Sequence, residues 1–378
     1  SEMCIRDRLL VVNHALPPVS EWAFHLDLWQ FPFQLSGLCA DNGQKVTPFS
    51  SEYFTLVKPF YQLLADAGQK VITAYIKDGA FNKGQTMVKW HEAADGKWSF
   101  DYTGFDKFVA QMMSWGIGRQ ISCFSLVGWN TSIGYTDASG EARTLKLTVG
   151  SDEYRTVWNE FLDSFERHLK TKGWFEKTVL YMDEIREDEM RQVVSFIKQH
   201  NPDWKIGLAG SAVSSDVESA FYDYSTILGY DRTSTNAVAT FYTSCAQSIP
   251  NAYVSLDNNP AEMVWVAWYA KAKGLNGFLR WAYDYWTKAD PQDVRDGSNT
   301  AGDFSLIYRS DNSLSSVPLS SIRLELLREG IQDYEKMRIL STNLMNPVVQ
   351  KFTLTSGRFA GEIVTEAQGM LKKISAEY

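Results

Sequence analysis

The sequence has few residues of the types that build metal sites or disulfide frameworks. Its 378 residues include 5 histidines and 4 cysteines, and the cysteines are scattered without a CxxC pair. This spacing argues against a zinc ribbon and against a disulfide-stapled scaffold. No cluster of His, Asp and Glu with ligand spacing accompanies His25 or His91, so we expect both to be structural. We predict no metal and no other cofactor.

Basic residues are fewer than acidic ones. There are 37 Lys and Arg against 45 Asp and Glu, which gives a formal net charge of −8. A nucleic-acid binder needs a basic face to neutralise phosphates, so this class is excluded. The chain also lacks an apolar run of ~18 residues, so we predict no transmembrane helix. A hydrophobic content of 44% indicates a globular protein with a sizeable core.

The first eight residues, SEMCIRDR, do not read as a signal peptide, because no apolar segment with a cleavage site follows them. The string resembles the translated sequencing adapter found at the ends of metagenomic gene models. We therefore expect residues 1–8 to be a non-native leader and the natural N-terminus to be missing. The oligomeric state and the location stay open, with a secreted or periplasmic location among the alternatives.

Eight short apolar, β-branched or aromatic runs alternate with longer segments of helical pattern. The expected strands are Trp22–Gln30, Lys70–Lys77, Gln120–Trp129, Thr178–Glu184, Lys205–Ala209, Thr226–Tyr230, Thr240–Ser244 and Gly277–Tyr283. The expected helices are Ser51–Ala67, Phe105–Trp115, Asp152–Lys172, Glu187–His200, Ala261–Lys273 and Ser320–Leu340. Strands that alternate with helices indicate βαβ units, and eight strands predict an α/β fold of the (β/α)8 TIM barrel type. We expect the barrel to span residues 9–341 and a short C-terminal helical extension to span 342–378.

The ends of these strands carry the candidate binding residues, because barrel active sites lie at the C-terminal ends of the strands. Aromatic rings there can pack on the C–H faces of a sugar while polar groups bind its hydroxyls. The candidates are Asp27, Trp29, Trp129, Asn130, Tyr242, Arg280, Trp281, Tyr283, Asp284 and Trp286. Purely structural alternatives stay open for some of them. Trp281 could belong to the barrel core, the Tyr242 hydroxyl could be hydrogen-bonded to the backbone, and Arg280 could form an ion pair with Asp284.

Two adjacent acids, Asp183 and Glu184, close the fourth expected strand in the string LYMDE. Neighbouring side chains of a strand point to opposite faces, so two acids fit best at a strand end, where both can turn toward the opening. The alternative is a helix cap followed by a solvated acid. Two acids this close repel each other, so one of them should have a raised pKa, which suits a general acid.

Adjacent acids fit poorly with the usual two-carboxylate glycosidase, whose carboxylates flank the scissile bond from different strands. They suit a substrate-assisted reaction, in which the 2-acetamido oxygen of the sugar attacks C1. Glu184 would protonate the leaving oxygen, and Asp183 would orient the acetamido N–H and stabilise the oxazolinium intermediate.

Over most of Trp22–Leu340 the sequence resembles glycoside hydrolase family 123. The longest match lies in Gly277–Leu340, with GFLRWAYDYWTKADPQDVRD, AGDFSLIYRSDN and SSIRLELLREGIQDYEKMRIL, and shorter ones are HLDLWQFP, ADAGQKVITAYI, LYMDE and TFYTSC. The resemblance implies an exo-acting β-N-acetylgalactosaminidase with Glu184 as acid–base and Asp183 as the acetamido-orienting residue. Similarity to related acetamido-sugar barrels makes Trp281 the floor of the acetamido pocket. The family usually carries a β-sandwich domain before the barrel, and we expect this chain to lack it.

Three functions stay open at this point. The leading one is a retaining exo-β-N-acetylgalactosaminidase, whose partner is a glycan with terminal β-GalNAc. The second is a barrel glycosidase for another 2-acetamido sugar such as β-GlcNAc, from which β-GalNAc differs in one hydroxyl. The third is a catalytically silent glycan-binding module, against which the pair Asp183 and Glu184 argues, because a binding module needs no general acid.

Overall fold

The computed structural model describes residues 11–12, 14–78, 85–255, 257–291, 293–295, 302–340 and 343–377. The expected leader, residues 1–8, lies outside the described residues. So do residues 341 and 342, where the expected barrel meets the expected extension.

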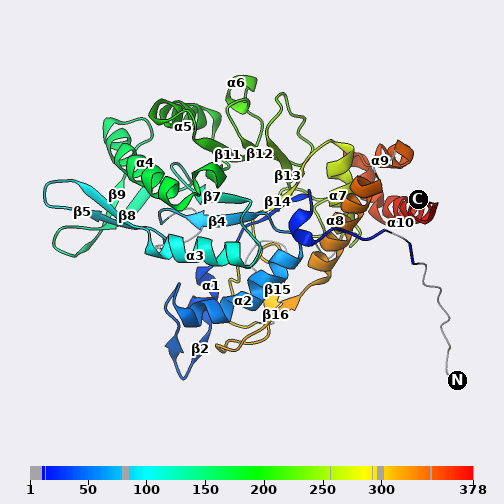
Figure 1. Cartoon of the computed structure of the whole chain (residues 1–378), viewed down its shortest axis with the longest axis horizontal. Helices are drawn as coiled ribbons and strands as arrows, with labels where there is room; N and C mark the ends of the chain where they lie inside the picture. Colours follow the sequence, from blue (N-terminus) through cyan, green and yellow to red (C-terminus); the bar gives the residue numbers. More distant parts are fainter. Residues whose placement is uncertain are drawn as a thin grey trace.

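Eight parallel strands form one sheet that curves into a barrel (Figure 1). The strands are β1 (His25–Leu28), β4 (Val71–Tyr75), β7 (Gln120–Phe124), β10 (Thr178–Asp183), β11 (Lys205–Gly210), β12 (Asp223–Ile227), β13 (Val238–Tyr242) and β14 (Gly277–Arg280). Their order is β1-β14-β13-β12-β11-β10-β7-β4, so the first strand pairs with the last. This arrangement confirms the predicted (β/α)8 barrel. The prediction for β12 began three residues late, because its polar start, Asp223-Tyr224-Ser225, carries no apolar run.

The barrel closes between β1 and β4, and buried amide side chains complete this closure. One isolated bridge joins Leu26 to Gln69. The Gln69 side chain accepts the N–H of Leu28 at 2.9 Å and donates to the carbonyl of Val71 at 2.8 Å. Gln30 accepts the N–H of Thr73 at 2.9 Å. These side chains satisfy backbone groups that would otherwise be buried without partners.

Helices surround the barrel (Figure 1). The α-helices are α1 (Phe33–Leu38), α2 (Ser51–Asp66), α3 (Thr103–Ser114), α4 (Asp152–Lys172), α5 (Glu187–His200), α6 (Ser215–Glu218), α7 (Glu262–Ala272), α8 (Ile322–Leu340), α9 (Asn346–Val349) and α10 (Ala360–Glu377). The 3-10 helices are η1 (Val19–Glu21), η2 (Phe175–Lys177), η3 (Asn343–Met345) and η4 (Leu354–Phe359). Helices α4 and α5 match their predicted bounds, and Gly173 ends α4 in the left-handed region at φ 71°. No helix separates β12 from β13, all of whose connecting residues are described.

A second, four-stranded sheet stands outside the barrel, and the sequence analysis missed it. Its strands are β5 (Lys89–Glu92), β6 (Trp98–Asp101), β8 (Ser132–Thr136) and β9 (Ala142–Lys146), in the order β6-β5-β8-β9. They are short and mostly only partly buried, so they carry no apolar run. The buried Trp90 anchors the sheet to α4 by stacking on Phe161 at 4.7 Å. Two hairpins were also missed: β2 (Ala40–Asp41) with β3 (Gln44–Lys45), and β15 (Ile307–Arg309) with β16 (Pro318–Ser320).

The interior of the barrel is polar below and aromatic above. Strand alternation and register place one set of side chains inside. Asp27 and Asp223 lie in the lower layers, and both are buried. Above them, Trp29 contacts Phe124 and Tyr181, with ring centroids 4.9 and 6.3 Å apart. This aromatic layer lies beneath the mouth, which we define as the opening at the C-terminal ends of the barrel strands.

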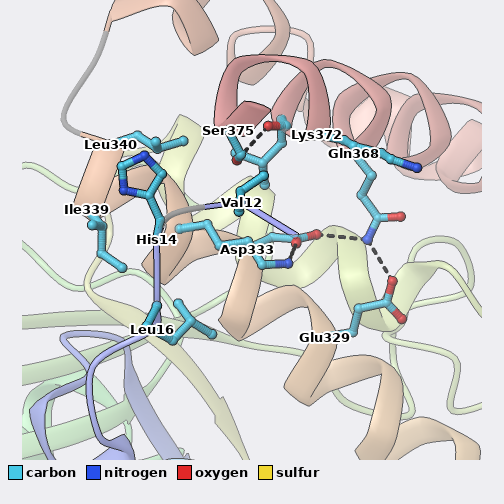
Figure 2. Close-up of a pocket in the computed structure, with 13 residues that line it drawn as sticks. Val12, His14, Leu16, Glu329, Asp333, Ile339, Leu340, Gln368, Lys372 and Ser375 are labelled. Carbon is cyan, nitrogen blue, oxygen red and sulfur yellow. Dashed lines mark hydrogen bonds and ion pairs between the residues drawn. The ribbon is translucent and has the colours of Figure 1, made fainter. Parts of the chain in front are cut away.

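The C-terminal helices pack on α7 and α8. Trp268 of α7 stacks on Phe352 at 5.1 Å, and Gln368 of α10 donates to Asp333 of α8 at 2.8 Å. A cavity of about 450 Å³ lies between the chain segment around His14 and the helices α8 and α10, and Figure 2 shows the residues that line it. Among the described residues, no helix is both long enough and apolar enough to cross a membrane.

Candidate active site

The turn after β10 brings two adjacent acids to the mouth. Asp183 ends β10 and has the same strand parity as Tyr181, whose ring belongs to the aromatic layer. Asp183 therefore projects into the mouth above that layer. Glu184 has φ 50°, in the left-handed region, and its N–H donates to the carbonyl of Ala209 on β11 at 2.7 Å. Regular strand geometry would point Glu184 to the opposite face, and this turn redirects it.

The two carboxyl groups have different surroundings. Asp183 is half-buried and Glu184 is exposed. Burial, and then the charge of Glu184, raise the pKa of Asp183 well above its ordinary value. The expected raised pKa thus falls on Asp183. This is the residue that the sequence analysis assigned to orienting the substrate, whereas Glu184 was the expected acid.

Tyr242 ends β13 and connects this strand to the acid pair. Its hydroxyl donates to Oε1 of Glu184 at 2.9 Å, so a backbone partner, the alternative considered for it, is wrong. Burial and the charge of Glu184 raise the pKa of Tyr242, which keeps the phenol protonated and able to donate. A phenol that donates to one carboxylate oxygen leaves the other oxygen of Glu184 available for chemistry.

The loop after β7 places Trp129 and Asn130 beside Glu184. The Trp129 side chain is 68% exposed, and its Nε1–H donates to the carbonyl of Asp183 at 3.2 Å. The Asn130 side chain accepts the N–H of Ser132 at 2.8 Å. The structure therefore brings five of the predicted residues to one side of the mouth: Trp129, Asn130, Asp183, Glu184 and Tyr242.

Trp281 follows β14 and belongs to an aromatic cluster that the sequence analysis did not identify. Its ring is 6.0 Å from Phe31, 4.7 Å from Phe304 and 5.8 Å from Tyr285. Trp281 remains partly exposed, as a residue that contacts a ligand must be. Phe31 and Tyr285 follow the first and last strands, so their positions alone could have suggested them.

The remaining predicted residues are held in packing contacts. Asp27 and Trp29 are buried, and burial and the charge of Asp223 raise the pKa of Asp27. The Tyr283 hydroxyl donates to the carbonyl of Phe60 at 2.8 Å, and Nε1 of Trp286 donates to the carbonyl of Ile307 at 2.9 Å.

Arg280 and Asp284 do not pair with each other, which corrects the alternative considered for them. The Arg280 guanidinium donates to Asp303 and to the carbonyl of Thr243. Asp284 accepts the N–H of Phe31 at 2.7 Å and the hydroxyl of Tyr61 at 3.2 Å. Because β14 ends at Arg280, the chain turns before Asp284, and the two side chains face different neighbours. Burial raises the pKa of Asp284 to about 7.

The chemistry of the site rests on carboxyl, phenol and aromatic groups. Among the residues that the structure describes, no three His, Cys, Asp or Glu side chains gather as metal ligands. Burial, together with the charges of Arg119 and Lys70, lowers the pKa of His25 to about 3. A neutral imidazole inside the barrel fits the structural role expected for this residue.

Comparison with known proteins connects this site to a family. The family model described as glycoside hydrolase 123, catalytic domain, matches residues 35–340. Among solved structures, the chain is similar to a family 123 glycoside hydrolase from Clostridium perfringens, solved to study glycolipid glycan hydrolysis, with 24% identity and a TM-score of 0.86 over 97% of this chain and 72% of that one. It is also similar to the catalytic domain of the family 30 xylanase C from Talaromyces cellulolyticus, with 11% identity and a TM-score of 0.41 over 83% of this chain and 76% of that one. No curated protein matches significantly.

The raised pKa of Asp183 leads to a stability prediction. Above the ordinary Asp value of 3.8 the unfolded chain has lost this proton, whereas the folded chain keeps it up to a higher pH. Stability should therefore fall as the pH rises through that window, and the full cost of the buried charge is present above it. Asp183→Asn carries no charge, so its Tm should exceed that of the wild type at mildly alkaline pH.

The Tm difference should shrink as the pH is lowered and disappear near pH 3.8. Thermal melting across this pH range measures it, and Asp203→Asn is the control, because Asp203 is exposed. A Tm at or below that of the wild type at alkaline pH would show that the fold does not disfavour charge on Asp183.

Proposed function

Because this chain belongs to glycoside hydrolase family 123 and hydrolyses glycosides, we propose that it is a retaining exo-β-N-acetylgalactosaminidase. One observation supports the proposal most strongly: Asp183 and Glu184 meet at the mouth with their carboxyl groups in different surroundings. The substrate we propose is a glycan that ends in β-GalNAc. The Clostridium perfringens relative was studied on glycolipid glycans, so glycolipid glycans that end in β-GalNAc are suitable first substrates to test.

In the proposed reaction, the acetamido oxygen of the substrate attacks C1 and a cyclic oxazolinium forms. The carboxyl group of Asp183 accepts a hydrogen bond from the acetamido N–H and so orients the acetamido group. As positive charge develops on the oxazolinium, the ionised form of Asp183 becomes favoured despite its burial, so its interaction strengthens in the transition state. Glu184 gives its proton to the leaving oxygen and then takes one from water. The sugar keeps its configuration because C1 is inverted twice.

A carboxylate nucleophile fits this site less well. Four further acids among the described residues already have contacts or a place of their own: Asp27 lies beneath the aromatic layer, Asp78 accepts the N–H of Gly134, Asp284 contacts Phe31 and Tyr61, and Asp303 pairs with Arg280. In a two-carboxylate retaining enzyme the second group faces C1 from another strand, about 5 Å from the acid. The partly exposed Trp281 and its aromatic neighbours offer an apolar floor for the acetamido methyl group.

The first test is hydrolysis of 4-nitrophenyl β-GalNAc and 4-nitrophenyl β-GlcNAc, with NMR detection of the first anomer released. We expect preferential cleavage of the β-GalNAc glycoside and initial release of the β-anomer. Preference for β-GlcNAc would reassign the substrate, and an initial α-anomer would refute the retaining mechanism. Binding of both glycosides without turnover would instead identify a glycan-binding module.

The second test addresses the acid. Glu184→Gln should lower kcat/KM by ~10²–10⁴-fold on substrates with poor leaving groups, which need a proton, and much less on 4-nitrophenyl glycosides. Steady-state kinetics on a series of leaving groups measures this difference. Glu153→Gln, an exposed change in the first turn of α4, is the matched control and should behave like the wild type. Equal losses across the series would mean that Glu184 is not the general acid.

A further inference from the structure

A groove of about 520 Å³ opens beside Glu184, along the loop that follows β7. It is lined by Gly128, Trp129, Asn130, Thr131, Lys146, Glu184, Ile185, Arg186 and Glu189. Glu184 lines this groove and Asp183 does not, although the two are adjacent in the chain. The left-handed turn at Glu184 fits this division, because it brings Glu184 to the mouth, where the residue lines the groove next to the interior face that Asp183 occupies.

Trp129 forms an exposed aromatic wall of the groove. An indole that is 68% exposed beside an active site is unusual in a chain whose other large aromatic residues are mostly buried. Its ring is nevertheless held in place, because Nε1–H donates to the carbonyl of Asp183 at 3.2 Å. The wall is therefore apolar, accessible and fixed before any ligand arrives.

The loop that carries Trp129 is fixed from beneath by a buried lysine. Lys77, at the end of the β4 segment, is 3% exposed, and its Nζ donates to the carbonyls of Asn130 and Ser132 at 2.9 and 3.0 Å. From Ser132 the chain continues directly into β8 of the outer sheet. A binding wall that is ordered in advance loses little conformational entropy when a ligand binds.

On the basis of the proposed function, we propose that this groove is the leaving-group subsite, where Trp129 stacks on the first sugar beyond the scissile bond. A general acid must lie within hydrogen-bond reach of the oxygen that it protonates. That oxygen joins the GalNAc, held on the Asp183 side, to the rest of the glycan. A groove lined by Glu184 and not by Asp183 is therefore placed to take the rest of the glycan.

The chemistry of the groove fits a neutral sugar. Its volume lies in the range of about 300–1,000 Å³ that is usual for small-ligand pockets. Trp129 offers an apolar face for the C–H side of a ring, and other lining residues offer polar groups for hydroxyls. The lining includes two basic residues, Lys146 and Arg186, and two acidic ones, Glu184 and Glu189, and Arg186 already pairs with Asp188 at 2.6 Å. No single charge dominates, so sulfated or sialylated glycans are not favoured.

The experiment separates the two sides of the scissile bond. The disaccharide GalNAc-β-1,3-galactose fills both sides, whereas GalNAc-thiazoline, a mimic of the oxazolinium, fills only the Asp183 side. Trp129→Ala should lower kcat/KM on the disaccharide about tenfold or more and change the Ki of the thiazoline by less than about twofold. Trp129→Phe keeps an aromatic face without the indole N–H, and it should recover most of the disaccharide activity.

Lys89→Ala, an exposed change on β5 of the outer sheet, is the matched control and should behave like the wild type. Melting curves of each variant confirm that it folds. Equal losses on the disaccharide and the thiazoline in Trp129→Ala would overturn the assignment, because Trp129 would then act on the GalNAc side. The assignment would also be overturned if Trp129→Phe were as impaired as Trp129→Ala. The indole would then act through its hydrogen bond to the carbonyl of Asp183 rather than by stacking on a sugar. A wild-type enzyme that neither cleaves the disaccharide nor binds the thiazoline would overturn the proposed function itself.

Discussion

The hydrogen bond from the N–H of Glu184 to the carbonyl of Ala209 fixes the turn on which the whole site depends. It extends the pairing of β10 with β11 by one residue while the backbone of Glu184 enters the left-handed region. A regular strand would send two consecutive carboxylates to opposite faces of the sheet. Here the turn places Asp183 over the barrel interior and Glu184 over the adjoining groove. A side chain in this conformation carries backbone strain, and such strain is typical of residues whose position is functional.

The barrel beneath this turn supplies the difference between the two acids. The aromatic layer formed by Trp29, Phe124 and Tyr181 excludes water below Asp183, which makes the charged form of this residue costly. Glu184 is exposed and receives a hydrogen bond from Tyr242. One turn thus places a carboxyl group whose pKa is raised by burial beside an exposed carboxyl group that accepts a hydrogen bond, and the proposed reaction uses this difference.

The sequence was sufficient to predict the barrel and the location of the acid pair. All eight strand predictions overlap barrel strands, because their apolar runs are bounded by glycine and proline signals. The outer sheet was not predicted, because its strands are short and mostly only partly buried, and packing of Trp90 on α4 holds it in place. The partners of Tyr242 and Arg280 could not be read from the sequence, because they depend on the backbone angle at Glu184 and on Asp303 in a distant loop. Phe304 contacts Trp281 only through the tertiary fold, so no sequence pattern around Phe304 indicates that it belongs to the site.

The central claim is that the nucleophile belongs to the substrate, and the basicity of the acetamido oxygen tests it most directly. The measurement is kcat on 4-nitrophenyl β-GalNAc glycosides whose acetamido group carries zero, one, two or three fluorine atoms. Fluorine withdraws electron density from the attacking oxygen, so the account predicts a progressive fall in kcat across the series. An unchanged kcat, or a covalent glycosyl-enzyme trapped on any Asp or Glu, would contradict it and indicate a carboxylate nucleophile.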